Sequence, residues 1–514
     1  MDPLNELRVL ITADEAYGAL EEAVLDAKTR IDAGFRVFDP RTPLRSERAR
    51  AIGATWIDLL VHKLDQGVRI TFSLSDFDPV VRAEMHQSSW KALSVFAGIA
   101  ELSSRGDLLR ARVADHPARV GWGPRLMLWP KVQRQIAGTC DRLNALPDAA
   151  RREAWRCMPL FRRFVTRAGG RLRPRRDMLV PMMPVTHHQK VAVVDDRVLY
   201  IGGLDLDHRR IDTTGHHGPS DQTWHDVQVM TTDPVRARAA RDHLDRFMAE
   251  CAGQVPVTPP PGLLRTLSSR RRREAAHLSP HVCDTGILDR HLTQIGEARQ
   301  LIYLESQFLR DPMIADALAA RARKAPDLEL VVMLPAAPME VAFDGEDSLD
   351  LQYGEFLQAR ALDQLTQAYG DRLFVGAPAQ IREAQNEEGR QLLHGAPVIF
   401  VHSKVSVFDD RAGLVTSANL NGRSMRWDTE IGIEISDPAQ VRHLRARTMG
   451  AWLPEGADAT MTDAVPGTAG RWRQLAVTNA ATAPRSRQGF VLPYEIAPAR
   501  EMGRPLPGVP KEMV

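Results

Sequence analysis

Residues 187–206 read HHQKVAVVDDRVLYIGGLDL, and residues 401–410 read VHSKVSVFDD. Both contain the spacing HxKxxxxD. The shared residues are His188, Lys190 and Asp195 and, 214 positions later, His402, Lys404 and Asp409. Only 8 of the 67 basic residues are lysines, so two lysines at one motif position indicate a need for a compact ammonium group. The repeat predicts a duplicated unit that brings two histidines to one substrate.

Each motif is predicted to lie on a β-hairpin. The expected strands are residues 191–194 and 198–201 in the first copy, and 405–408 and 414–415 in the second. Because side chains alternate along a strand, each histidine and its lysine project from one face. Asp195 and Asp409 have the opposite parity and fall at the turns. We interpret both as structural residues that accept hydrogen bonds from backbone N–H groups.

The surrounding pattern predicts an α/β protein. Apolar residues at helical spacing cover residues 56–64 and end at Gly67, and an alternating strand follows at 68–72. The second half repeats this layout with a strand at 302–304, a helix around 314–322 and an apolar strand at 328–334. Helices that alternate with strands favour the α/β class.

A proline-rich stretch, VPVTPPPG at residues 255–262, is the predicted joint between two lobes. The lobes are expected at 1–254 and 263–453, with one motif in each. Residues 454–514 are rich in Ala, Thr, Pro and Gly and are predicted to be an irregular extension. Trp472, Phe490 and Tyr494 favour its packing over the body rather than disorder.

The composition is that of a globular protein, with 44% hydrophobic and 26% charged residues in a chain of 514. Its net charge is only +2, but ten arginines crowd residues 151–177, and Arg270–Arg273 form a run. These patches suit a phosphate-bearing surface, and an ordinary solvated face is the alternative. The four cysteines, Cys140, Cys157, Cys251 and Cys283, are too far apart for a CxxC motif and are expected to be reduced thiols.

No apolar run approaches the roughly 20 residues of a membrane span. Residues 1–6 lack the basic start of a secretory signal. The expected location is the cytoplasm or the membrane periphery, with export by a signal-independent route as the alternative.

Two His–Lys pairs around one point would suit a phosphoryl group, since cationic donors stabilise its oxygens in the transition state. One imidazole can attack phosphorus while the other protonates the leaving alcohol, which gives a phosphohistidine. The pattern therefore predicts one neutral and one protonated histidine and a bell-shaped pH profile.

Such histidines need carboxylates to orient them. Asp226 in TWHDVQV (223–229) and Glu430 in RWDTEIGI (426–433) are the predicted partners, with Asp428 as the alternative to Glu430. Metal binding is the competing interpretation, because histidines crowd residues 187–225. No zinc-type spacing occurs there, and Pro280 interrupts the HxxxH of His277 and His281. Neither a metal nor another cofactor is expected.

With these motifs, the chain resembles the phospholipase D superfamily, in particular the catalytic region of its eukaryotic-type lipid enzymes, over roughly residues 7–450. IYLESQFL (302–309) and TSANLNGRSMRWDTEIGI (416–433) also resemble that family. The resemblance implies a bilobal, pseudo-twofold α/β fold of two mixed sheets flanked by helices, with the active site at the lobe interface.

The resemblance also implies roles for individual residues in metal-independent, ping-pong chemistry. His188 would be the nucleophile, and His402 the acid and then the base. The residues expected to contact or approach phosphate are Lys190, Lys404, Gly203, Ser417 and Asn419. Asp205, which follows Gly203 in the first copy, is expected to be structural.

The function predicted from this resemblance is hydrolysis of glycerophospholipids to phosphatidic acid and the free headgroup, with transphosphatidylation to an alcohol as a variant. The alternatives are a phosphatidyltransferase of cardiolipin-synthase type, a superfamily nuclease and, last, a non-enzymatic scaffold on anionic membranes. The expected partner is phospholipid at a membrane surface rather than nucleic acid. A monomer is expected because one chain carries both half-sites.

Overall fold

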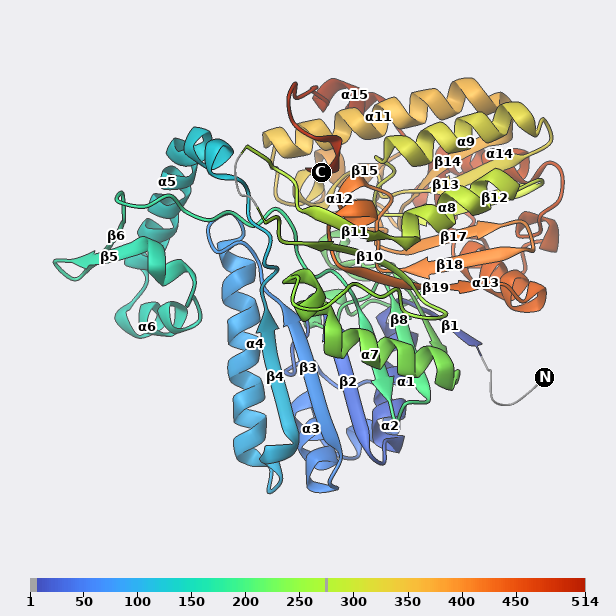
Figure 1. Ribbon diagram of the computed structural model, residues 1–514. Coiled ribbons are helices and arrows are strands. Elements are labelled where there is room, and N and C mark those ends of the chain that lie inside the picture. Colours follow the sequence, from blue (N-terminus) through green and yellow to red (C-terminus); the bar gives the residue numbers. More distant parts are fainter. Residues whose placement is uncertain (1–6, 273–275, 514) are drawn as a thin grey trace.

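The computed structural model describes residues 7–272 and 276–513, so residues 1–6 and Arg273 of the arginine run lie outside the described residues. It contains two large mixed β-sheets with helices around them (Figure 1). The first sheet, in spatial order, consists of β1 (Leu7–Ile11), β9 (Val227–Thr231), β8 (Val198–Gly202), β7 (Val191–Val194), β2 (Arg30–Phe35), β3 (Arg69–Ser75) and β4 (Leu109–Ala114). We call this sheet, with the helices packed on it, the first lobe.

The second sheet defines the second lobe. In spatial order it consists of β11 (His281–Thr285), β10 (Leu264–Ser269), β19 (Glu430–Ile435), β18 (Ala412–Thr416), β17 (Lys404–Phe408), β12 (Leu301–Ser306), β13 (Glu329–Met333), β14 (Leu373–Pro378) and β20 (Val491–Pro493). Six neighbouring strands have the same order and direction in both sheets: β9-β8-β7-β2-β3-β4 matches β19-β18-β17-β12-β13-β14. This match confirms the predicted pseudo-twofold α/β architecture.

The two sheets share a core at the lobe interface. The alternating residues Val191 and Val193 of β7 pack in the same apolar cluster as Val405 and Val407 of β17. Residues of the other parity in β7, Ala192 and Val194, face a second cluster beneath the helices of the first lobe. β7 is therefore buried on both faces, as its continuous apolar sequence requires.

Helices cover the remaining faces. Those that pack on the first sheet are α1 (Thr12–Asp26), α3 (Trp56–Asp65), α4 (Ala83–Leu102) and α7 (Pro234–Cys251); α2 (Glu47–Arg50) packs beside α1. Those of the second lobe are α8 (Gly286–Glu297), α9 (Pro312–Lys324), α10 (Met339–Ala342), α11 (Leu349–Tyr369), α12 (Gly422–Arg426) and α13 (Pro438–Gly450). The predicted helices at 56–64 and 314–322 are thus confirmed as α3 and α9. The predicted joint, residues 255–262, connects α7 to β10 without a helix or strand of its own.

One segment has no large counterpart in the second lobe. Between β4 and β7 the chain forms α5 (Trp122–Ala145), α6 (Asp148–Arg156) and a small hairpin, β5 (Val165–Ala168) and β6 (Arg171–Pro174), which stand away from the first sheet (Figure 1). The matching connection between β14 and β17 holds a single-turn 3-10 helix (Gly389–Gln391) and the short strands β15 (Leu392–Leu393) and β16 (Ala396–Pro397).

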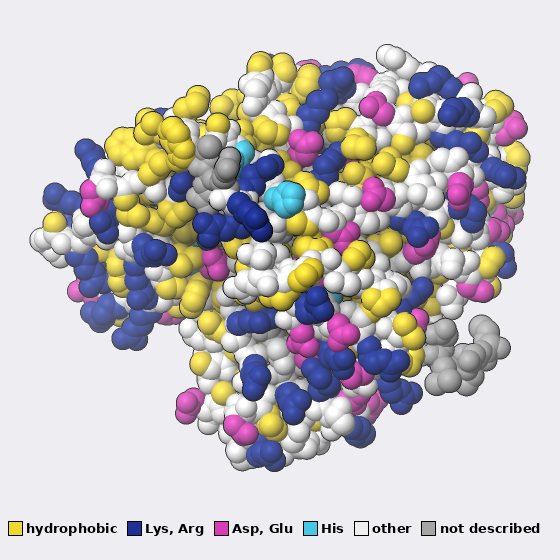
Figure 2. Space-filling model, viewed as in Figure 1, with side chains coloured by type: hydrophobic (Ala, Val, Ile, Leu, Met, Phe, Trp, Pro, Cys, Tyr) yellow, Lys and Arg dark blue, Asp and Glu magenta, His cyan; other side chains and the backbone are white. Residues whose placement is uncertain are grey.

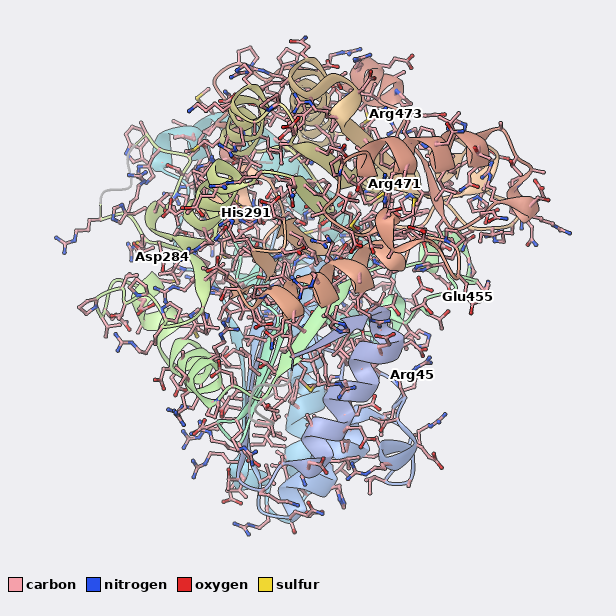
Figure 3. All side chains as sticks on the ribbon, turned by 90° about the vertical axis from the view of Figure 1, so that its right-hand side faces the viewer. Arg45, Asp284, His291, Glu455, Arg471 and Arg473 are labelled. Atoms are coloured by element: carbon pink, nitrogen blue, oxygen red, sulfur yellow. The ribbon has the colours of Figure 1, made fainter. Side chains whose placement is uncertain are left out.

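The C-terminal segment is more regular than the sequence predicted. It contains α14 (Thr468–Ala480) and α15 (Ala497–Met502), and β20 extends the second sheet by pairing with β14. Trp472 is fully buried against this sheet, so the segment packs over the body. Arg473, labelled in Figure 3, donates to the carbonyls of Asp371 and Leu373 at 2.7 and 2.6 Å. The prediction of an irregular extension was wrong because tertiary packing supplies the order that its composition does not.

Two further features bear on the environment of the protein. The four cysteines are free thiols, of which Cys283 is partly exposed and the others are buried. Within the described residues, no helix combines the length and the apolar character that crossing a bilayer requires.

Candidate active site

The two motif histidines meet at one cavity of about 700 Å³ between the lobes. His188 lies just before β7, and His402 just before β17, so each stands at the start of a central strand. The backbone of each histidine is hydrogen-bonded to the segment that follows the other motif. The N–H of His188 donates to the Thr429 carbonyl, and that of His402 to the His225 carbonyl, both at 2.8 Å. The chain segments that follow the two motifs therefore hold the histidines crosswise.

The predicted carboxylates complete this crosswise arrangement. Nδ1 of His188 lies 3.0 and 3.1 Å from the two carboxylate oxygens of Glu430. Nδ1 of His402 lies 2.6 Å from Oδ2 of Asp226. Asp428, the alternative, instead accepts from the Thr186 N–H and pairs with an arginine. An Nδ1–H held by a carboxylate leaves Nε2 of each imidazole as the nitrogen available to a substrate.

Both motif lysines are buried beside their histidines. Nζ of Lys190 donates to the His188 carbonyl at 2.7 Å and lies 3.7 Å from Oδ2 of Asp205. Nζ of Lys404 donates to the His402 carbonyl and lies 3.0 Å from Nδ1 of the same residue. Two lysines and two carboxyl groups thus surround the imidazoles, and all four side chains are buried.

This environment favours the neutral form of both histidines. Burial lowers the pKa of His188 and of His402 well below the ordinary range, and the neighbouring lysines lower each further. Burial also lowers the pKa of Lys404 to about 7 and that of Lys190 to about 8. An anionic phosphate in the cavity would oppose these shifts, because it stabilises every nearby cation.

Three residues predicted to approach phosphate have structural contacts of their own. A Cβ on Gly203 would collide with the Asp226 carboxylate and lie 3.0 Å from Cδ of Lys404, so this glycine makes room for both groups. The Ser417 hydroxyl donates to Glu430 at 2.5 Å. Asn419 lines the cavity, and its Nδ2 donates to Gln307 at 3.1 Å.

The motif aspartates lie at the hairpin turns. Asp195 accepts from the backbone N–H groups of residues 28, 29 and 30 at 2.7–2.9 Å. Asp409 accepts from those of residues 299, 300 and 301 at 2.8–2.9 Å. Each therefore joins the turn after a motif strand to the start of the neighbouring strand, β2 or β12. Asp205 accepts from the Val37 N–H at 2.8 Å.

Sequence reasoning missed a set of cavity-lining arginines: Arg36, Arg41, Arg82, Arg209, Arg210, Arg310 and Arg423. Arg36 and Arg423 help to lower the pKa of His188, Arg36 after burial and Lys190, and Arg423 after Lys404 as well. Arg36 directly follows β2, and ligands commonly bind beyond the carboxyl ends of parallel strands, which is the signal that could have identified it. In the described part of the chain, no group of three His, Cys, Asp or Glu side chains is arranged to hold a metal ion.

Several known proteins are similar to this chain. A family model described as "Cardiolipin synthase, PLD-like domain" matches residues 292–452. Phospholipase D1 of Schizosaccharomyces pombe is 26% identical over 349 residues, which cover 49% of this chain and 25% of that protein. Cardiolipin synthase of Listeria welshimeri is 22% identical over 302 residues, covering 55% of this chain and 52% of that one.

A solved structure of phosphatidylserine synthase from Haemophilus influenzae is similar with a TM-score of 0.42 and 12% identity, over 86% of each chain. The family model, the relatives and the duplicated motif all support one enzyme class for this chain, the phospholipase D superfamily. It matches about a quarter to a half of the length of the two curated relatives named above.

Proposed function

We propose that this protein is a phospholipase D-type phosphodiesterase that hydrolyses glycerophospholipids to phosphatidic acid and a free headgroup. The observation that carries the proposal is the crosswise pairing of His188 with Glu430 and of His402 with Asp226 at one cavity. Two oriented imidazoles on one cavity can serve as nucleophile and acid for a single phosphodiester.

In the proposed first step, Nε2 of His188 attacks phosphorus and forms the N–P bond as the bond to the headgroup oxygen breaks. Nε2 of His402 donates its proton to that oxygen, so the headgroup leaves as a neutral alcohol. Glu430 and Asp226 accept from Nδ1 and stabilise the imidazolium that forms on each histidine in turn. Lys190 and Lys404 stabilise the negative charge of the phosphoryl oxygens.

In the proposed second step, neutral His402 takes a proton from water, and the hydroxide attacks phosphorus. The N–P bond breaks, and its electron pair returns to His188. A second alcohol in place of water would give transphosphatidylation by the same route. We further propose that Ser417 holds Glu430, that Gly203 makes room for Asp226, and that Asn419 contacts the substrate. A monomer would suffice, because both half-sites lie on one chain.

A phosphatidyltransferase of cardiolipin-synthase type is the second candidate, favoured by the match of residues 292–452 to that family model. One experiment separates the two. Phosphatidylcholine, phosphatidylethanolamine and phosphatidylglycerol are each offered with and without a primary alcohol, and the products are identified by mass spectrometry. Phosphatidic acid without added alcohol supports the hydrolase. Cardiolipin and glycerol from phosphatidylglycerol alone would support the transferase.

The same assay tests the site and the alternative substrate. The His188→Ala and His402→Ala variants should each lose turnover, and turnover by the wild type should survive EDTA. DNA cleavage without lipid turnover would overturn the lipase proposal, and wild-type activity in either variant would overturn the shared site.

A further inference from the structure

Residues 122–180, which include α5, α6, β5 and β6, form a small unit that projects from the first lobe (Figure 1). The unit has its own apolar core, in which Ile136 and Cys140 of α5 pack against Phe161 and Leu172. Because this core holds α5 and α6 together, the outer surface of the unit is a defined face rather than an unstructured loop.

The unit is strongly basic. It contains fourteen Lys and Arg residues against four Asp and Glu, a net charge of +10, whereas the whole chain has a net charge of only +2. Most of the arginines after α6 are exposed, among them Arg163, Arg167, Arg171, Arg173 and Arg176. A local charge of this size attracts an anionic surface.

An apolar crest lies on the first turns of α5, where the chain enters the same unit. Trp122, Leu126 and Met127 of α5 are 56%, 61% and 83% exposed, and their spacing places them on one side of the helix. None of the first ten residues of α5 is buried, since burial begins at Val132. Figure 2 shows hydrophobic side chains gathered at the upper left, over α5, with Lys and Arg side chains around and below them.

The unit is joined to the wall of the active-site cavity. Val80 and Ala83 belong to its core, while Phe77, Arg82 and Met85 from the same stretch line the cavity. Two cavity-lining residues of α4 also pair with it: Glu84 with Arg142 of α5, and Lys91 with Glu153 of α6, the latter at 3.5 Å. The position of the unit therefore fixes the orientation of the cavity relative to a surface that binds the crest.

We propose that residues 122–180 dock the enzyme on anionic phospholipid bilayers. Trp122, Leu126 and Met127 enter the boundary between headgroups and acyl chains, and the surrounding arginines bind lipid phosphates. The inference rests on the proposed function, because docking has a catalytic purpose only if the substrate lies in the bilayer. A nucleic-acid surface would use the same arginines but would leave the exposed Leu126 and Met127 without an apolar environment.

The test is flotation of the full-length protein with vesicles of phosphatidylcholine alone, or containing about 30% phosphatidylglycerol to supply negative charge. The docking variant is Leu126→Ser/Met127→Ser. Its matched control is Leu102→Ser/Val477→Ser, which removes two helical apolar side chains, 69% and 52% exposed, outside the unit. Binding of double-stranded DNA is measured in parallel, and turnover is assayed on vesicles and on a monomeric short-chain phospholipid.

The wild type and the control should bind the anionic vesicles, and the docking variant should bind them about tenfold more weakly or worse. The variant should lose vesicle turnover but retain turnover of the monomeric substrate. Equal vesicle binding by wild type and docking variant would overturn the proposal, as would binding to DNA without binding to vesicles. Vesicle binding without any lipid turnover would instead contradict the proposed function and leave the docking inference standing.

Discussion

The two lobes share six strands in one order, yet their half-sites differ in charge and in support. In the first lobe Lys190 has a carboxylate, Asp205, at 3.7 Å, whereas the residue that matches Asp205 in the second motif is the neutral Asn419. Burial lowers the pKa of Lys404 to about 7, opposed most by Asp226, and that of Lys190 to about 8, opposed most by Asp205. The carboxylates differ as well, since Glu430 also accepts from Ser417, while Asp226 lies against Gly203. A duplicated scaffold has thus acquired two unequal halves, which suits a reaction with one nucleophile and one acid.

The largest effect is expected when either motif histidine is removed. His188→Ala and His402→Ala should each lower kcat/KM by about 10⁴-fold, because neither half can replace the other. His281→Ala, at an exposed position on β11, serves as the control. Wild type quenched in alkaline denaturant, where the N–P bond is stable, should carry the phosphatidyl adduct on His188, as mass spectrometry of its peptides can show. An adduct on His402 would reverse the roles of the lobes.

The carboxylates test whether orientation is needed on both sides. Asp226→Asn and Glu430→Gln should each lower kcat by about 10²- to 10³-fold, since an amide no longer stabilises the imidazolium beside it. Steady-state kinetics should show a smaller change in KM than in kcat. If only one of the two variants is impaired, the other carboxylate has no catalytic part.

Gly203 tests the steric difference between the lobes. Gly203→Ala should lower kcat about tenfold or more, because the added methyl group displaces the Asp226 carboxylate from His402. Gly98→Ala is the matched control, since its Cβ would meet nothing within 4 Å. Equal kcat values in the two variants would show that the close contact at Gly203 does not matter.

The pH dependence of kcat/KM tests the lowered pKa values of the site. A lysine whose pKa is lowered to about 7 loses its charge as the pH rises through that value, so kcat/KM should fall several-fold between pH 7 and 8. The two histidines act in opposite directions: the lowered pKa keeps the proposed nucleophile His188 neutral and active, whereas the proposed acid His402 loses its proton as the pH rises. Bound phosphate raises these pKa values, so the alkaline limb of kcat should lie at higher pH than that of kcat/KM. A kcat/KM that stays flat from pH 6 to 9 would contradict the assignment.

The smallest effect on activity is expected at the turns. Asp195→Ala and Asp409→Ala each remove the acceptor for three backbone N–H groups, and each should lower the free energy of unfolding by about 1–3 kcal/mol. Urea denaturation measures this loss, and kcat of the folded fraction should stay near the wild-type value. A large loss of kcat with normal stability would give the aspartates a catalytic part.

Much of the architecture could be predicted from local patterns. The duplicated HxK pairs, the hairpins that carry them and the strand–helix–strand units follow from periodicity over short stretches, where neighbouring residues settle the backbone. The same patterns selected Asp226 and Glu430, because these residues follow the two motifs in parallel positions. The regular structure after Pro454 could not be predicted, since its order comes from contact with β14 and from the burial of Trp472.

The sequence by itself determined the chemical groups of the site and their twofold repetition. Only the tertiary structure decided which groups meet. His188 pairs with Glu430, 242 positions away, and His402 with Asp226, 176 positions away. They meet because the two sheets share one core and the segment before each motif strand pairs with a segment of the other lobe. The tertiary structure also buries each lysine beside its histidine. It places the basic unit, residues 122–180, next to the cavity. Such contacts depend on burial and on the registration of distant strands, which local spacing does not contain.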